Sequence, residues 1–305
     1  MPGKSWSEAL PPMNARQSAT SAQLRRDVTH LAGAIGDRNL FAMSKLTEAA
    51  NYLESRFREI GFTPVRQAVP ARMGTGHNLE VEIRGANRPE EIVVVGAHYD
   101  SVFGCPGAND NATGTAALLA LAASFAGSPP DRTLRFVAFV NEEPPFFQSG
   151  EMGSRVYAKR CRERGDRITA MLSLETLGCY SDLDGSQKYP FPVGLFYPSK
   201  GNFVGFVGNL GSRSLVRRVV ASFRKGAHFP SQGAALPSWL PGIGWSDHES
   251  FWVEGYPAVM VTDTATFRYH HYHLVSDTPD KIDYDRCARV VVGMRDVIAD
   301  LCSAD

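Results

Sequence analysis

Residues 91–114 read EIVVVGAHYDSVFGCPGANDNATG, and they carry the most informative pattern in the chain. The β-branched run at 92–95 is typical of a strand that is buried on both faces of an α/β sheet. Gly96 ends this run, and His98 and Asp100 follow it. Open α/β sheets bind their ligands at the carboxyl ends of strands. The stretch therefore predicts a functional site at this strand end.

The second half of the stretch is a glycine-punctuated loop that leads into an apolar segment. The loop delivers Asp110, and residues 112–126 are predicted to form a helix packed against the sheet. One strand end thus supplies an imidazole and two carboxylates from His98, Asp100 and Asp110. This combination of ligand types is typical of a metal site.

The whole chain has the size and composition of one large α/β domain. It contains 305 residues, of which 43% are apolar, and this is ample for a hydrophobic core. No repeat or linker divides it, so we expect a flexible segment at 1–20 and a single catalytic domain at 21–305. The predicted fold is a three-layer α/β/α sandwich around a central, mixed and mostly parallel sheet.

Charge and cysteine content exclude several classes of protein. Thirty-two basic residues balance thirty-two acidic ones, so no global field favours nucleic acid or an anionic membrane. No apolar run has the length of a transmembrane helix. The five cysteines form no CxxC pair, which argues against a disulfide framework and a thiolate zinc site. The N-terminus lacks an apolar signal region, which favours the cytoplasm and leaves export after trimming as the alternative. The pattern indicates no oligomeric state.

The remaining elements follow from periodicity and turn residues. The predicted helices are residues 24–35, 46–60, 152–164, 212–224 and 287–301, and the predicted strands are 65–69, 78–83, 133–140, 168–174 and 257–262. Two segments rich in glycine, proline and serine, 180–192 and 226–246, are predicted to be long loops.

More acidic and imidazole groups follow the other predicted strands. Glu142 and Glu143 come after strand 133–140, Glu175 ends the next strand, and His273 lies in FRYHHYHLVSDT near the C-terminus. If these strands are parallel neighbours, the carboxylates converge and need a cation to stay ionised. Successive side chains at a strand end point apart, so one of the two adjacent glutamates can bind metal while the other acts as a base.

Five motifs in this order resemble the di-zinc exopeptidase family. They are HYDS, GANDNATG, NEE, SLETLG and YHLVSDT, and the resemblance covers about residue 24 to the C-terminus. The family includes bacterial leucyl aminopeptidases, aminopeptidase Y, glutamate carboxypeptidase and the glutaminyl cyclases. The resemblance implies two zinc ions, or one if the chain is similar to a cyclase.

The resemblance also implies a role for each matching residue. His98 and Glu175 would bind one metal, Glu143 and His273 the other, and Asp110 would bridge both. The family more often has aspartate where this chain has Glu175.

Four further residues have implied roles around these ligands. Glu142 would be the general base, and Asp100 would accept a hydrogen bond from the His98 ring. Tyr272 would donate a hydrogen bond to the oxyanion. Asp247, in WSDHESF, has two interpretations, a hydrogen bond near the site or a helix N-cap.

Other residues near these motifs receive structural interpretations. Asp277 is interpreted as a residue that structures its loop, and Arg268 as part of a surface salt bridge. Trp239, Trp245 and Phe251 form either an apolar substrate wall or part of the core.

Four functions are compatible with these residues, and an aminopeptidase acting on peptides or aminoacyl compounds ranks first. A glutaminyl cyclase ranks second, followed by a carboxypeptidase or deacylase and by a binding module without catalysis. The loops at 101–114, 141–152, 176–190 and 240–250 contain a single basic residue, Lys188. An acidic rim favours a substrate's free amino group over its carboxylate.

Overall fold

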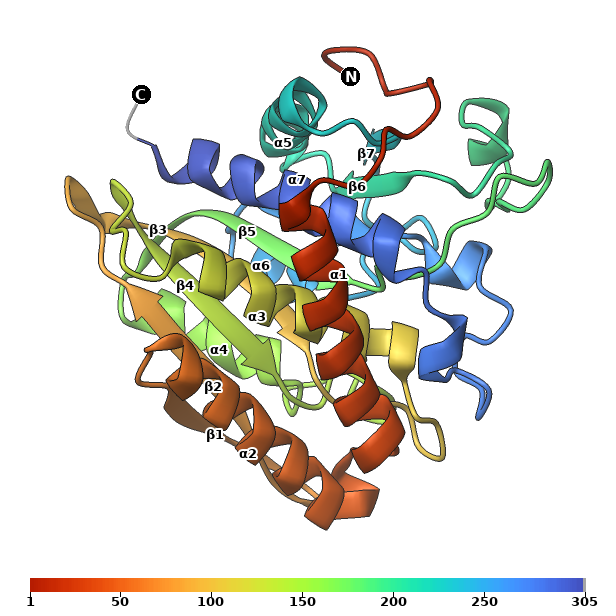
Figure 1. Ribbon diagram of the computed structural model, residues 1–305. Coiled ribbons are helices and arrows are strands. Elements are labelled where there is room, and N and C mark those ends of the chain that lie inside the picture. The colour runs from red at the N-terminus through yellow and green to blue at the C-terminus, as the bar shows by residue number, and fades with distance from the viewer. Residues whose placement is uncertain (304–305) are drawn as a thin grey trace.

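The computed structural model describes residues 1–303, and its strands form one eight-stranded mixed sheet (Figure 1). The strand order is β1-β2-β4-β3-β5-β8-β6-β7. Strands β3, β4, β5 and β8 run parallel to one another. The antiparallel pairs are β1–β2, β2–β4 and β6–β8, while β6 and β7 are parallel to each other. The strands are β1 (Val65–Ala71), β2 (Gly74–Ile83), β3 (Arg88–His98), β4 (Arg132–Phe139), β5 (Arg167–Glu175), β6 (Val204–Gly208), β7 (Ser231–Ala235) and β8 (Ala258–Thr262).

Helices cover both faces of this sheet, which confirms the predicted three layers. The apolar cluster on one face includes residues of α1, α2, α3, α5 and α7, and the cluster on the other face includes residues of α4 and α6 (Figure 1). Over residues 1–303, no helix is both long and apolar enough to span a membrane. The helices are α1 (Ala15–Val28), α2 (Met43–Ile60), α3 (Gly114–Phe125), α4 (Gly153–Glu163), α5 (Arg213–Gly226), α6 (His248–Val253) and α7 (Tyr284–Cys302).

Strand β3 lies at the centre of the sheet and is buried on both faces, as its sequence predicts. Val93 and Val95 point into one apolar core, while Ile92 and Val94 point into the other. Gly96 passes close to a neighbouring aromatic ring, because a Cβ atom there would lie 2.3 Å from Phe139. The β-branched run therefore packs into both cores, and the strand that it forms ends at the site.

Two strands at one end of the sheet were not expected. Strand β6 has no predicted counterpart, and β7 lies inside the segment 226–246 that is predicted to be a loop, so that prediction is wrong for these residues. Strand β7 reads SQGAA and lacks the β-branched and aromatic residues that mark strands. It is an edge strand that pairs only with β6, so its small residues receive their conformation from the neighbouring strand.

Helix α1 begins earlier than the apolar pattern that starts at Leu24. Asn14 accepts a hydrogen bond from the Gln17 amide at 2.9 Å, and the Gln17 side chain accepts one from the Asn14 amide at 3.0 Å. This reciprocal capping satisfies two amides at the helix start. The helix consequently begins at Ala15, inside the segment 1–20 that is predicted to be flexible.

Candidate metal centre

The acidic and imidazole side chains meet at the carboxyl edge of the parallel strands. His98 is the last residue of β3 and Glu175 the last of β5, while Glu142 and Glu143 follow the end of β4. His273 lies in the loop after β8, which runs parallel to β5. Because the ends of parallel strands share one edge, residues that are far apart in the sequence lie side by side here.

The first cluster consists of His98, Asp110 and Glu175. The His98 Nε2 atom lies 3.3 Å from an oxygen of Asp110 and 3.3 Å from an oxygen of Glu175. All three side chains are buried, and their ligand atoms lie within 4.8 Å of one another. The sequence-based grouping of these three residues is thus reproduced in space.

The second cluster consists of Asp110, Glu143 and His273. The His273 Nε2 atom lies 3.0 Å from Asp110 Oδ2 and 3.3 Å from Glu143 Oε2. Asp110 belongs to both clusters, with Oδ1 facing the His98 ring and Oδ2 facing the His273 ring. This is the arrangement that a carboxylate bridging two metal ions requires.

The donor atoms of both clusters lack ordinary hydrogen-bond partners. Both ring nitrogens of His98, the Nε2 atom of His273 and the Oε1 atom of Glu143 are buried without one. Buried polar atoms in a folded protein normally have a partner, so atoms like these call for an ion or a water molecule. Imidazole and carboxylate ligands without thiolates suit a catalytic zinc site. The two clusters therefore fit a pair of divalent metal ions.

The electrostatics of the clusters also indicate that a cation binds here. Burial, followed by the charge of Asp110, raises the pKa of Glu143 to about 7. Burial alone would lower the pKa of His273, but its close contacts with the carboxylates of Asp110 and Glu143 raise it to about 10. Buried carboxylates this close together cannot all stay ionised unless positive charge lies between them.

Glu142 is close to the clusters and belongs to neither. Its Oε2 atom lies 3.8 Å from His98 Nε2, and its carboxyl group has a strongly raised pKa because it is buried. The adjacent residue Glu143 turns toward His273 instead. The two glutamates therefore point apart, as expected for successive residues after a strand, and Glu142 is left free to move a proton.

Asp100 holds two parts of the site together. It lies 3.5 Å from the Nδ1 atom of His98, so it stands beside the ring as predicted, but the expected hydrogen bond is not formed at this distance. Its two oxygens also accept hydrogen bonds from the backbone amides of Glu142 and Glu143, at 3.2 and 3.1 Å. Sequence reasoning missed this second role, because the contact joins the ends of two strands that are distant in the sequence.

Asp277 and Asn109 position the loop that carries Asp110. The Asp277 carboxylate accepts hydrogen bonds from the backbone amides of Asn109 at 2.8 Å and Asp110 at 3.1 Å, and from the Tyr269 hydroxyl at 2.7 Å. Asn109 also donates to Asp263 at 2.9 Å. The interpretation of Asp277 as a loop-structuring residue is confirmed.

The side chain of Arg38 supports the same loop, and nothing in the sequence indicated this role. Its guanidinium is completely buried, where it donates to the carbonyl oxygens of Tyr99 at 2.7 Å, Gly36 at 3.2 Å and Gly107 at 2.8 Å, and also to that of Pro106. Burial lowers the pKa of Arg38 to about 10. The side chain therefore ties the start of the metal-site loop to the end of β3.

Three residues at the site have backbone conformations that are rare outside glycine. Asn141, Thr176 and His273 have φ values of 58°, 49° and 58°. The first directly precedes Glu142, the second directly follows Glu175, and the third belongs to a cluster itself. Such strain persists where the surrounding structure enforces it, and it concentrates at functional sites.

Two of the structural interpretations made from the sequence are wrong. Asp247 directly precedes α6, but its side chain caps no amide of that helix, and neither of its buried carboxylate oxygens has a hydrogen-bond partner, so the hydrogen bond expected near the site is not formed either. Burial raises the pKa of Asp247 to about 7. Arg268 is buried and forms no surface salt bridge, because it donates to Gln187 and to the carbonyl oxygens of Cys179 and Phe203.

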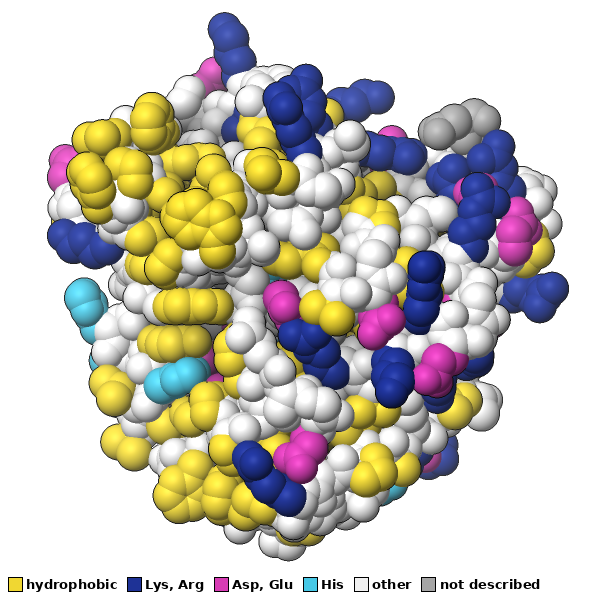
Figure 2. All heavy atoms as spheres, turned by 180° about the vertical axis from the view of Figure 1, so that it is seen from behind, with side chains coloured by type: hydrophobic (Ala, Val, Ile, Leu, Met, Phe, Trp, Pro, Cys, Tyr) yellow, Lys and Arg dark blue, Asp and Glu magenta, His cyan; other side chains and the backbone are white. Residues whose placement is uncertain are grey.

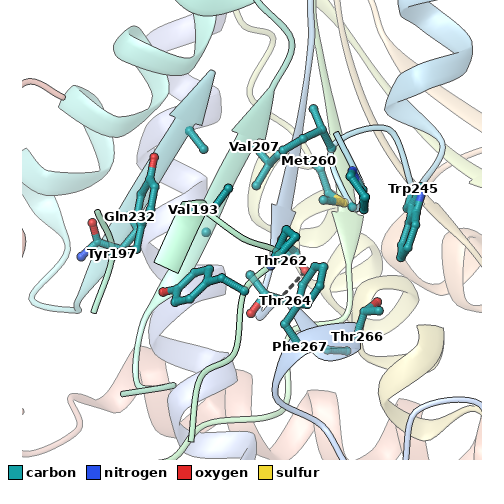
Figure 3. Close-up of a pocket in the computed structure, with 18 of the residues that line it drawn as sticks. Val193, Tyr197, Val207, Gln232, Trp245, Met260, Thr262, Thr264, Thr266 and Phe267 are labelled. Carbon is teal, nitrogen blue, oxygen red and sulfur yellow. Dashed lines mark hydrogen bonds between the residues drawn. The ribbon is translucent and has the colours of Figure 1, made fainter. Parts of the chain in front are cut away.

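A pocket opens directly beside the clusters (Figure 3). Glu175 and Tyr272 are among its lining residues, and the Tyr272 ring stacks on the His273 imidazole with ring centroids 3.9 Å apart. Of the three aromatic residues with two open interpretations, Trp245 lines this pocket, Phe251 lies in the core, and Trp239 is 79% exposed. A substrate bound here would place one end at the candidate metals.

Known proteins resemble the chain in both sequence and structure. The family model described as peptidase family M28 matches residues 78–298. Protein YfbL of Escherichia coli, which is uncharacterised, is 35% identical over 298 residues, covering 95% of this chain and 90% of that protein. The fold is similar to BSAP, a zinc aminopeptidase of Bacillus subtilis, with a TM-score of 0.71, 16% identity and coverage of 92% and 94% of the two chains. It is also similar to a Fimbriiglobus ruber glutaminyl cyclase, with a TM-score of 0.68, 20% identity and coverage of 97% and 98%.

Proposed function

Because the chain belongs to peptidase family M28, a family of metallopeptidases, we propose that it is a zinc-dependent aminopeptidase that removes the first residue of a peptide. The observation that carries this proposal is the position of Glu142, an uncommitted carboxylate beside two clusters that share Asp110. A general base needs to lie within reach of the reacting water without being tied up as a ligand.

Different residues have different roles in the proposed hydrolysis. Zinc ions bound at the two clusters would polarise the scissile carbonyl and lower the pKa of a water molecule. Glu142 accepts the proton of the attacking water and later returns it to the leaving amine. The hydroxyl group of Tyr272 is the proposed donor to the oxyanion, because this residue stands between the pocket and His273.

Charge at the site favours a free amino group over a carboxylate as the recognised end of the substrate. The clusters are rich in carboxylates, and the two arginines nearby are buried and donate to groups of the protein itself, although the Nη2 atom of Arg268 has no partner. Arg38 is fully buried against four carbonyl groups, and Arg268 is held by Gln187 and two carbonyl groups. The site consequently attracts an ammonium group and offers little to a C-terminal carboxylate.

Two complete clusters favour the aminopeptidase over the other functions. A cyclase-like site would use one zinc ion, whereas here the second cluster is as complete as the first. A binding module without catalysis would have no need for Glu142 beside that pair. The similarity to a glutaminyl cyclase, at 20% identity, is a similarity of fold. It therefore does not decide between an aminopeptidase and a cyclase, and the site residues have to.

Acetylation of the substrate amino group tests this proposal. We expect the zinc-loaded protein to hydrolyse aminoacyl amides and to cleave their N-acetylated forms at least about 100-fold more slowly in kcat/KM, because acetylation removes the charge that the acidic site recognises. Release of the free amino acid, measured by chromatography, gives both rates.

A peptide with an N-terminal glutamine belongs in the same assay. Cyclisation of this peptide with release of ammonia, without hydrolysis of the amides, would replace the aminopeptidase with a cyclase. Equal cleavage of the free and acetylated amides would instead indicate an enzyme that does not recognise the free amino group of its substrate.

A further inference from the structure

The pocket beside the clusters is almost entirely uncharged. Among the residues that the structure describes, Glu175 is the one ionisable acid or base in its lining apart from tyrosine hydroxyls. Trp245 and Phe267 form part of its wall, with nearly parallel rings whose centroids are 6.5 Å apart. The pocket therefore suits a large, uncharged side chain.

The floor of this pocket is a part of the sheet that no α-helix covers. Val207 of β6 and Met260 and Thr262 of β8 line the pocket, while the alternate residues Phe206 and Val261 belong to the apolar core on the other face (Figure 3). Helices α4 and α6 pack on the pocket's face of the sheet over β3, β4 and β5. Among the described residues that line the pocket, none belongs to an α-helix.

Loops at 187–203 and 236–245 cover this floor in place of a helix. The first of them contributes Val193 and Tyr197 to the pocket, and its residues Phe191, Leu195 and Phe196 are 88%, 74% and 77% exposed. Figure 2 shows apolar side chains gathered at the upper left, over the loop that is coloured green in Figure 1. This loop is therefore apolar on its pocket side and on its outer side.

Gly205 of β6 lies in the middle of the floor. It pairs with Thr262 of β8 on one side and with Gln232 of β7 on the other, and all three residues line the pocket. A Cβ atom at Gly205 would face the pocket, because its nearest neighbours would be the pocket residues Thr262 and Thr264. Glycine is unfavourable inside a strand, since it is flexible and has no side chain to pack.

The usual structural reasons for a glycine in a strand do not apply to Gly205. Its φ angle is not in the left-handed region, and its pairing with both neighbouring strands is regular, so it forms neither a turn nor a bulge. A Cβ atom there would lie 3.4 Å from its nearest neighbour, an ordinary contact distance, whereas at Gly208 and Gly233 it would lie 2.6 and 2.7 Å from valine side chains. The remaining reason is the close approach of a ligand.

Gly205 also lies in line with the first metal cluster. Glu175 pairs with Thr262, and Thr262 pairs with Gly205, so the three residues form one row across β5, β8 and β6. Neighbouring strands are about 4.8 Å apart, which places Gly205 roughly 10 Å from Glu175 along this row. A substrate residue whose peptide bond lies at the clusters reaches Gly205 only if its side chain is long.

We propose that Gly205 determines the size of the first residue that the enzyme removes, because it leaves the floor of the pocket open to a large apolar side chain. This inference rests on the proposed aminopeptidase function. A side chain at position 205 would occupy the space that phenylalanine needs, whereas alanine ends before it. The enzyme should consequently remove phenylalanine faster than alanine.

The test compares the dipeptides Phe-Gly and Ala-Gly in the zinc-loaded protein and in Gly205→Val. We expect kcat/KM of the unmodified protein to be at least about tenfold higher for Phe-Gly, because the larger side chain removes more apolar surface from water. Gly205→Val should lower kcat/KM for Phe-Gly at least about tenfold, since a single methylene in an apolar pocket changes it by about 10–200-fold. The loss on Ala-Gly should be much smaller. Valine favours strands, so β6 should persist.

Two more variants make the comparison specific. Gly205→Ala adds only the Cβ atom and should lower the Phe/Ala ratio by a smaller factor than Gly205→Val. Gly211→Val is the matched control, because Gly211 is exposed and outside the pocket lining, and a Cβ atom there would also lie 3.4 Å from its nearest neighbour. It should keep the Phe/Ala ratio of the unmodified protein.

The role of Gly205 and the proposed function fail in different ways. A Phe/Ala ratio that is unchanged in both Gly205→Ala and Gly205→Val would overturn the role of Gly205 and leave the aminopeptidase intact, even if both rates fell together in Gly205→Val. Faster cleavage of Ala-Gly than of Phe-Gly by the unmodified protein would have the same meaning. Failure of the unmodified protein to cleave either dipeptide would overturn the proposed function, and the role of Gly205 with it.

Discussion

Replacement of Glu142 by glutamine should lower kcat by about 10²–10⁴-fold while zinc content and fold stay unchanged. Glutamine keeps the size of the side chain but cannot accept and return a proton. Glu142 belongs to neither cluster of candidate ligands, so the substitution removes no metal-binding oxygen. Steady-state rates on an aminoacyl amide and elemental analysis of the same sample measure the two effects separately.

Two further variants show whether this loss is specific to the base. Glu143→Gln should lower both zinc content and activity, because Glu143 faces His273 in the second cluster. Glu90→Gln changes an exposed glutamate at the other end of β3 and should have no effect. If Glu142→Gln retained near-normal turnover, the proposed chemistry would be wrong.

Replacement of Arg38 by methionine should destabilise the protein by more than about 3 kcal/mol. The guanidinium satisfies the carbonyl groups of Gly36, Tyr99, Pro106 and Gly107 in a fully buried position. Each buried polar group that is left unpaired costs about 1–3 kcal/mol, so the loss of several partners should consume much of a stability that is typically about 5–15 kcal/mol. Urea unfolding, followed by circular dichroism, measures the difference.

The exposed residue Arg84 provides the matched control for this substitution. Arg84→Met should change the free energy of unfolding by less than about 0.5 kcal/mol, as is usual for surface positions. An Arg38→Met protein as stable as Arg84→Met would show that the buried guanidinium does not hold the loop. A variant with no cooperative transition at all would mean that the loss exceeds the whole stability of the fold.

The parts of this structure that were predictable carry local signals in the sequence. The β-branched run of β3 shows burial on both faces, and His98 and Asp110 follow it at a place where α/β sheets bind ligands. Glu142 and Glu175 lie at the ends of other apolar runs, so they were expected at the same edge. Assignment of individual ligand roles needed the resemblance to a family, because spacing alone does not say which carboxylate faces which imidazole.

The parts that were missed depend on contacts between distant segments. Arg38 stands alone in a polar stretch, and nothing in its neighbours shows that four carbonyl groups surround it. Trp245 and Phe267 become a pair only when two loops fold together. Strand β7 has the composition of a loop and becomes a strand by pairing with β6. Edge pairing and buried arginines both depend on tertiary structure more than on local propensity.

The central claim is that this site binds two metal ions that share Asp110. The most direct measurement is a zinc titration of chelator-treated protein, followed by calorimetry and by the return of aminopeptidase activity. The account predicts saturation at two zinc ions per chain, with full activity reached only at the second, and loss of both binding events in Asp110→Ala. Saturation at one ion per chain, or two binding events that survive in Asp110→Ala, would contradict it.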